Sequence, residues 1–298
     1  MVLFLSDGTQ IRGDLIRSAT VRSDLAPVPV TLEAEIRSDD SMEALLAVGE
    51  LVSTGGGDSL RIVRSVRVAE RDVQGEREMA AMRITALLDA CEPIAYVRSR
   101  AIIKEGATLA AIYRAAGATI KGVEADFPVP RFYCPVGDTP TFQIARVLQE
   151  QGGAVRWRNG GLQFKRLPDL FKQEPAKTLP DNASDDVESG FMERHQVPWF
   201  LSIDAAGAAV FGNRDKPRVA RFSPFKDELQ LRNMTRCLVH RKTMRITLDG
   251  QLCAGDLVEF AGGEKLAIIT AAHCFASGTD DGGTADTYTR LWLGSLEE

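Results

Sequence analysis

The stretch Asp138-Thr139-Pro140-Thr141-Phe142-Gln143-Ile144-Ala145-Arg146-Val147-Leu148-Gln149-Glu150-Gln151-Gly152-Gly153 is typical of a capped amphipathic helix. Its start offers an N-cap candidate at residues 138–139 and a proline suited to the first turn, and its paired glycines end the helix. Helical spacing predicts one buried stripe that is made of Phe142, Ile144, Ala145, Val147 and Leu148.

A hairpin is predicted directly after this helix. Residues 154–158 and 162–167 are two alternating apolar runs, and Asn159-Gly160 stands between them. Asn-Gly in that position is the strongest short signal for a two-residue hairpin turn. Upstream, the alanine-rich residues 107–116 have helical spacing and stop at Gly117. The centre of the chain is therefore predicted to be an α/β unit of two helices and a hairpin.

Both flanks of this unit have the pattern of short strands separated by turns. The predicted strands before the unit are residues 15–16, 20–22, 28–36, 60–68 and 82–88. Those after it are residues 199–203, 208–211, 238–240, 244–248, 257–260, 267–270 and 288–293. Short strands at this spacing favour small barrels or sandwiches.

The fold class that follows is α+β and β-rich, with two small β-barrel domains joined by an α/β segment. Residues 1–95 are predicted to form the N-terminal β-barrel, and residues 96–171 the α/β helix-hairpin domain. Residues 172–190, which are rich in proline and acidic side chains, are expected to form a linker or an exposed loop. Residues 191–298 are assigned to a C-terminal β-barrel region.

Composition bounds the class of protein. Of 298 residues, 44% are hydrophobic and 26% charged, as in ordinary globular proteins. The formal net charge is −5, so the composition does not indicate a nucleic-acid-binding protein. No apolar run is long enough to cross a bilayer, so membrane insertion is not expected. The N-terminus lacks a basic region, so no signal peptide is predicted. Five scattered cysteines without a CxxC pair suggest folding in a reducing cytosol.

Two strings resemble catalytic motifs. Thr270-Ala271-Ala272-His273-Cys274 matches the sequence around the catalytic base of trypsin-like proteases, but only 25 residues follow His273, too few for that fold's second barrel. Gly57-Asp58-Ser59-Leu60 matches the name motif of a lipase/esterase family, yet it follows a flexible turn, and no histidine has an Asp three residues before it. Since geometry defines a triad, a serine hydrolase that uses Ser59 and His273 remains an alternative.

Metal and sugar binding have weaker support. Candidate zinc ligands are Cys237, His240, Cys253, His273 and Cys274. These residues lack the paired short spacings of zinc ligands, so a zinc site is not favoured. No metal ion and no cofactor is predicted.

A cell-wall or carbohydrate-binding β module is a further alternative. It depends only on three tryptophans, Trp157, Trp199 and Trp292. Aromatic residues at strand positions are more often part of a core.

The order of these segments resembles the phage late-control protein D family. Residues 131–153, followed by Val155-Arg156-Trp157 and Leu162-Gln163-Phe164, are similar to that family's extended segment, helix and hairpin. Residues 255–273 and 288–294 look like its final strands. The resemblance covers about 90 to 167 and 240 to 298. This family includes baseplate-hub proteins of contractile tails and the hub part of type VI secretion spike proteins.

The resemblance implies a structural protein and not an enzyme. Three copies are expected to form a homotrimeric ring of six β-barrels, so that a threefold protein has a pseudo-sixfold face. That ring is expected to adapt a hexameric tail tube to a trimeric tail spike. Implied partners are the spike, the tube and baseplate proteins, with genomic DNA or a tape measure in the lumen. The expected location is the virion tail baseplate, after assembly in the host cytoplasm.

One departure from the family concerns the end of the chain. Type VI spike proteins continue past the hub into a small barrel and a long β-prism, whereas this sequence stops at Glu298. The resemblance therefore implies that the spike is a separate polypeptide and that no lysozyme-like domain is fused to the hub.

Overall fold

The structure, a computed structural model, describes residues 1–38, 40–74, 77–180, 184–186, 198–214, 219–278 and 284–297. Strands predominate, which confirms the β-rich class expected from the sequence. The first part contains β1 (Leu3–Leu5), β2 (Ile16–Asp24), β3 (Val30–Ser38), α1 (Asp40–Leu45), β4 (Leu51–Thr54), β5 (Ser59–Gln74) and β6 (Arg77–Leu88). The central part contains η1 (Glu92–Ala95), β7 (Ile102–Thr108), α2 (Leu109–Ala115), β8 (Val123–Glu124), β9 (Pro128–Cys134), α3 (Pro140–Glu150), β10 (Gly153–Arg158), β11 (Gly161–Arg166) and α4 (Leu167–Leu170). The last part contains β12 (Lys177–Leu179), β13 (Ser184–Asp186), β14 (Trp199–Ile203), β15 (Ala209–Phe211), β16 (Ala220–Phe222), α6 (Glu228–Met234), β17 (Cys237–Thr247), β18 (Leu257–Phe260), β19 (Lys265–Ala276) and β20 (Asp286–Glu297).

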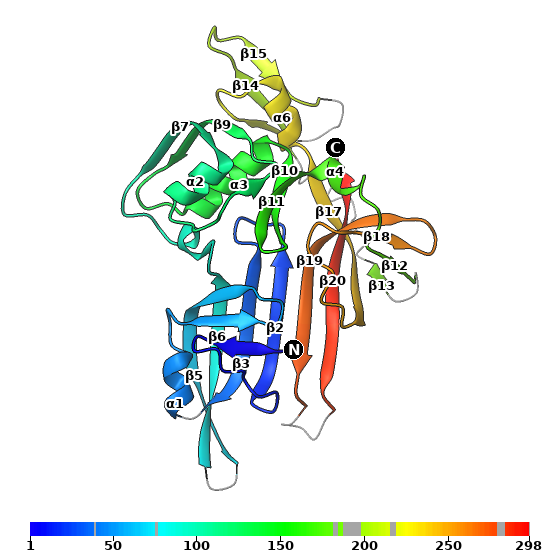
Figure 1. Cartoon of the computed structure of the whole chain (residues 1–298). Coiled ribbons are helices and arrows are strands. Elements are labelled where there is room, and N and C mark those ends of the chain that lie inside the picture. Colours follow the sequence, from blue (N-terminus) through cyan, green and yellow to red (C-terminus); the bar gives the residue numbers. More distant parts are fainter. Residues whose placement is uncertain are drawn as a thin grey trace.

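One 12-stranded sheet contains strands from both ends of the chain. Its order is β1-β4-β5-β6-β3-β2-β19-β20-β17-β13, with β18 and β12 attached beside β19. The two ends meet where β2 pairs antiparallel with β19, from Asp24↔Thr270 to Ser18↔Ala276 (Figure 1). Within the described residues no sheet closes into a barrel. A continuous open sheet stands where the sequence suggested two separate barrels.

Two long strands combine segments that the sequence analysis separated. In β2, the predicted pieces 15–16 and 20–22 are joined across a register shift between Ile16 and Ser18. In β17, the pieces 238–240 and 244–248 are joined across a shift between His240 and Lys242. A bulge adds one residue and interrupts the alternation of side chains, so the pattern ends locally while the strand continues.

Helix α3 covers the β7–β9 ribbon with a narrower apolar stripe than predicted. Ile144, Val147 and Leu148 are buried as expected, but Phe142 is 58% exposed and Ala145 is also exposed. Pro140, Ile144 and Val147 define the buried side of the helix. Phe142 lies two positions from both Pro140 and Ile144, so helical geometry turns it to the opposite side. The helix therefore leaves an aromatic ring on the surface.

The predicted hairpin is confirmed. Strands β10 and β11 pair from Gly153↔Arg166 to Arg158↔Gly161, and Asn159 and Gly160 form the turn with φ of 52° and 70°. Two successive positive φ angles define a type I′ turn, whose twist matches the strands that it joins. Strand β8 adds to β11 in parallel, which the sequence did not suggest.

The segment 199–235 is separate from the main sheet. Strands β15, β14 and β16 form their own three-stranded sheet, and α6 packs on it through Phe200, Leu231 and Met234. The sequence predicts β14 and β15 as strands of the C-terminal barrel region, and no helix is predicted where α6 forms. Figure 1 shows this small module projecting beyond the central helices.

Hydrophobic cores cross the expected domain boundaries. One continuous core includes Leu3 and Ile84 of the N-terminal part together with Ile144 and Phe164 of the central unit. A second core lies under the C-terminal strands and includes Leu179 of β12, which pairs in parallel with β18. The stretch expected to be a linker thus contributes a strand and a core residue. Among the described helices, none has both the length and the apolar character that crossing a bilayer requires.

Gly153 is predicted to be essential for the packing of the hairpin against its own strand partner. A Cβ at this position would lie 2.5 Å from the Lys165 carbonyl oxygen and from the Phe164 ring. Gly153→Ala should therefore lower the free energy of unfolding by about 1–3 kcal/mol in urea denaturation. Gly122→Ala is the matched control because its Cβ would meet nothing within 4 Å, and no loss is expected there.

Candidate functional site: polar sheet face and buried arginine–aspartate junction

The main sheet has one apolar and one polar face. The apolar face carries buried residues such as Leu32, Ile84 and Leu291, and β1, β4, α1 and β18 contribute to the cores beneath it. Cross-strand register places another set of side chains on the opposite face, since residues directly opposite in a ladder share a face. We call this the polar sheet face: Arg64, Val66, Arg83, Thr85, Thr31, Glu33, Glu35, Ser18, Thr20, Arg22, Asp24, Thr270, Cys274, Tyr288, Arg290, Trp292, Thr243, Arg245 and Thr247.

Charges on the polar sheet face are of both signs, and two of its arginines form ion pairs. Arg83 binds Glu35 at 2.7 Å, and Arg245 binds Asp286 at 2.5 Å. The Arg245 guanidinium also lies 3.8 Å from the centre of the Tyr288 ring. Arginines committed to neighbouring carboxylates and rings present a weak net field to solvent, so this face is polar without being a strong cation surface.

A hollow of about 380 Å³ lies on this face near the β2–β19 pairing. Its lining includes Arg22, Asp24, Thr270, His240 and Trp292. Burial raises the pKa of Asp24, while the hydrogen bond from Thr270 Oγ1 and the charge of Arg22 act in the opposite direction. The Nε atom of Arg22 is buried and has no hydrogen-bond partner among the described residues.

Both ends of the main sheet have strand edges without a partner in the described chain. Strand β4 pairs only with Ser59–Arg61 of the 16-residue β5, so the rest of that edge is open. At the other end, β13 pairs only with residues 242–244 of β17. Open edges present unpaired backbone N–H and C=O groups and are natural sites of strand addition.

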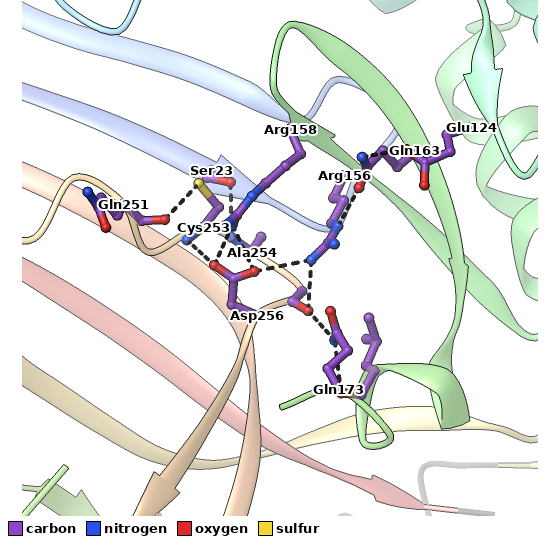
Figure 2. A network of polar contacts seen from close by, with 12 residues as sticks. Ser23, Glu124, Arg156, Arg158, Gln163, Gln173, Gln251, Cys253, Ala254 and Asp256 are labelled. Atoms are coloured by element: carbon purple, nitrogen blue, oxygen red, sulfur yellow. Dashed lines mark hydrogen bonds and ion pairs between the residues drawn. The ribbon is translucent and has the colours of Figure 1, made fainter. Parts of the chain in front are cut away.

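A buried ionic junction holds the hairpin against the seam between the two ends of the chain. Asp256, 7% exposed, receives two hydrogen bonds from Nη1 of Arg158, at 2.6 and 2.8 Å, and one from Nη1 of Arg156 at 3.2 Å. Cys253 N donates to the same carboxylate, and Ala254 N donates to Ser23 Oγ on β2 (Figure 2). Three parts of the chain therefore meet here: hairpin, C-terminal loop and β2.

Arg156 makes further hydrogen bonds beyond its contact with Asp256. Arg156 also donates to the Gly255 carbonyl oxygen at 3.1 Å and to Gln163 Oε1 at 3.0 Å. Burial lowers the pKa of Arg156, and Asp256 counteracts that effect. For Arg158 burial also acts downward, but the hydrogen bond and charge of Asp256 outweigh it and raise the pKa. Both guanidinium groups stay charged, so the junction is a salt bridge at all physiological pH.

The two candidate hydrolase residues are not paired with each other. His273 Nδ1 lies 3.0 Å from Thr289 Oγ1, and Thr289 Oγ1 accepts a hydrogen bond from Asp249 N at 2.9 Å. Ser59 makes no side-chain hydrogen bond to His273 in the described structure. Strand β19 continues through Ala276, beyond the predicted strand 267–270, so His273 lies inside the strand. Its contacts tie β19 and β20 to the turn at Asp249.

The Gly-Asp-Ser-Leu string has a structural contact of its own. Asp58 accepts a 2.7 Å hydrogen bond from Trp157 Nε1, which links the β4–β5 turn to the hairpin. Asp58, Trp157, Cys253 and His273 all line a cavity of about 280 Å³ on the apolar side of the seam. Burial and the charge of Asp256 raise the pKa of Cys253, so this thiol is protonated and a poor nucleophile.

The residues considered for zinc lie on three elements: Cys237 and His240 on β17, Cys253 in the loop before β18, and His273 and Cys274 on β19. Within the described parts of the chain, no three His, Cys, Asp or Glu side chains gather in a way that would hold a metal ion. The three tryptophans also lie apart: Trp157 in the hairpin, Trp199 in the small module and Trp292 on the polar sheet face. They do not form a common sugar-binding surface.

Comparisons with known proteins identify the fold. No family model and no curated protein matches the sequence. Solved structures do match along nearly the whole chain. A tail protein from Neisseria meningitidis superposes with a TM-score of 0.66 at 12% identity, covering 99% of this chain and 95% of that one. The 43 kDa tail protein of prophage MuSo2 from Shewanella oneidensis gives 0.61 at 15% identity, with coverage of 98% and 96%.

A third match extends the likeness to secretion systems. An Escherichia coli type VI secretion component, described as similar in structure to bacteriophage T4 tail proteins, gives a TM-score of 0.55 at 10% identity. It covers 95% of this chain and 74% of that protein. The chain thus has the fold of phage tail and type VI spike-related proteins, and the resemblance stated from its sequence is confirmed at the level of fold.

Removing the charge of Asp256 should destabilise the protein strongly. Asp256→Asn keeps the shape of the side chain but leaves Arg156 buried without a counter-charge, which should cost about 3–5 kcal/mol of unfolding free energy. Asp286→Asn is the matched control, because its pair with Arg245 is half exposed and should contribute less than about 1 kcal/mol. Equal losses in the two variants, measured by urea denaturation, would contradict a structural role for the junction.

His273 should make stability depend on pH. Burial lowers its pKa below the ordinary value of 6.5, against the opposing effects of a backbone hydrogen bond at Leu252 and the charge of Asp249. The unfolded chain therefore binds a proton that the folded chain resists, and the free energy of unfolding should fall as pH drops below 6.5. His273→Gln should flatten this slope in denaturation series between about pH 7 and 5. An unchanged slope would assign the pH dependence to other groups.

Proposed function

We propose that this chain is a structural baseplate hub protein of a contractile phage tail or tailocin. In this proposal it forms a homotrimer with pseudo-sixfold symmetry and adapts a hexameric tail tube to a trimeric spike. One observation carries the proposal: a single chain joins two β units into one open sheet with a polar face and free edges at both ends. The fold likeness to tail proteins, which spans both chains almost completely, supports it.

The free edges suggest how copies would associate. The open part of β5 in one copy would pair with the β13–β17 edge of the next, which extends the sheet from chain to chain. Repeating this contact around a threefold axis closes the sheet into a ring and removes every edge. Each ring then contains six β units, two per chain, and each unit is completed as a barrel-like domain by its neighbours.

The polar sheet face would line the lumen of this ring. Its apolar counterpart is already covered by the chain's own elements, so only the polar side is suited to contact with water and passing cargo. Because its arginines stand among carboxylates such as Glu33, Glu35 and Asp24, the face has little net charge, and genomic DNA or a tape measure could pass without specific binding. The remaining partners in this proposal are the spike on one side and the tube and baseplate proteins on the other.

A tail hub assembles in the host cytoplasm and ends in the virion baseplate, and it has no enzymatic role. Neither alternative gains an observation from the structure. A hydrolase lacks the Ser59–His273 contact, and the tryptophans of a carbohydrate-binding module lie on different parts of the fold.

The homotrimer is the most direct test. Three chains of 32.5 kDa should give about 97 kDa in multi-angle light scattering, alone or after mixing with a trimeric spike protein from the same tail. The free β5 and β13–β17 edges are the physical reason, because a lone chain leaves them unpaired. A chain that stays monomeric even with its spike partner would contradict the hub proposal.

The hydrolase alternative has its own control on the same sample. Folded protein should show no labelling of Ser59 by a fluorophosphonate probe. Labelling that disappears in a His273→Ala variant would instead establish the enzyme.

A further inference from the structure

The small module of residues 199–235 has an apolar sheet face that no other helix or strand of the described chain covers. Helix α6 packs on one side of its sheet. Strand alternation and the registers of β14 with β15 and β16 place a row of large side chains on the other side: Trp199, Leu201, Ile203, Phe211 and Phe222. Phe222 is 56% exposed and Ile203 is 37% exposed. Contiguous exposed apolar side chains of this size mark interaction surfaces.

Strand β16 gives this face an open edge. It pairs with β14 alone, and all three of its residues, Ala220, Arg221 and Phe222, are exposed. Its outer backbone groups can therefore accept another strand, which would extend both the ladder and the apolar row. The occupant suited to such an edge is an extended segment.

A strained aromatic residue follows this edge. Phe225 has a φ of 58° and is 79% exposed, although bulky residues rarely adopt the left-handed region. The turn is fixed on both sides: Ser223 N donates to the Leu201 carbonyl oxygen at 2.8 Å, and Lys226 N donates to Ser202 Oγ at 3.0 Å. Strain that holds an apolar ring in solvent is typical of a binding site.

The charge around the face is positive. The Arg214 guanidinium lies 3.8 Å from the centre of the Phe211 ring and 5.9 Å from that of Trp199. Arg221 stands on the open edge opposite Phe200, so its side chain lies on the α6 side of the sheet, where an added alternating strand would place its polar residues. The nearby acidic groups are engaged: Asp204 accepts from the backbone of its own turn, and Glu228 pairs with Arg232. A partner that complements this surface is acidic.

We infer that this face is the docking surface for an extended, acidic and apolar segment of a second, different polypeptide, which adds as a strand to β16. The inference deepens the proposed hub function, since that polypeptide would be another tail component. Self-association is disfavoured because two copies face to face would set the Arg214 cation against a face of the same charge. Nucleic acid is disfavoured because Leu201 and Ile203 offer no stacking surface and Arg214 already covers the rings.

The test uses the full chain and a short synthetic peptide of alternating valine and glutamate, with binding measured by isothermal calorimetry. This peptide should bind at least ~10-fold more tightly than the same peptide with lysine in place of glutamate. Phe222→Glu and Arg221→Glu should each weaken binding at least ~10-fold. Tyr133→Glu is the matched control, since Tyr133 is 51% exposed on β9, outside the module, and the variant should bind like wild type.

Further variants and outcomes keep the test decisive. Phe225→Gly removes both the ring and the strained conformation, so it should weaken binding without lowering Tm. Circular dichroism confirms that each variant is folded. The inference is overturned if the glutamate peptide does not bind, if the lysine peptide binds equally well, if Phe222→Glu has no effect, or if oligothymidylate binds more tightly. The mass measured by light scattering on the same samples separates the two proposals. A trimer that does not bind the peptide refutes the docking surface alone. A monomer that binds the peptide refutes the hub alone.

Discussion

The antiparallel pairing of β2 with β19 is the constraint on which the rest of this structure depends. It brings Asp24 and Thr270, 246 residues apart, into hydrogen-bonding contact and makes one sheet from the two ends of the chain. Such distant pairing closes a long loop and is entropically costly, so it needs support from elsewhere. The junction around Asp256 provides that support, because it links the C-terminal loop to β2 through Ala254 and Ser23 and to the hairpin through Arg158.

Local features were predictable from the sequence, and distant pairings were not. The Asn159-Gly160 turn and the helix that begins at Pro140 depend on residues within a few positions of one another, and both are confirmed. Phe142 was assigned to the wrong side of that helix because its spacing from Ala145 and Leu148 also fits an apolar stripe, and periodicity alone does not say which side of a helix the rest of the chain covers. The pairing of β2 with β19 left no signal in either strand, since both partners simply alternate.

The small module shows a different kind of error. Its strands β14 and β15 look like those of the main sheet, and only their separate pairing distinguishes them. Helix α6 did leave a signal: Asp227 and Gln230 form a capping box, in which each side chain binds the other's backbone N–H. The buried Arg156 and Asp256 lie 100 positions apart, so no spacing rule could have joined them. The two catalytic motif matches failed for the same reason. The residues next to Ser59 and His273 in sequence match known motifs, but the two side chains do not contact each other in the fold.

The two open surfaces of the molecule have opposite physical characters, and that contrast bears on function. On the main sheet the apolar face is covered by the chain itself, and the exposed side has charges of both signs, some of them paired, such as Arg83 with Glu35. A surface of this kind gains little free energy from contact and suits cargo that must move past it. In the small module the apolar face beside Phe222 stays uncovered, and a strained Phe225 is held in solvent next to it. Exposed apolar area costs free energy in the isolated chain, and a lasting contact with a partner recovers that free energy. The polar face of the main sheet is therefore suited to passing cargo, and the apolar face of the small module to attachment of a partner.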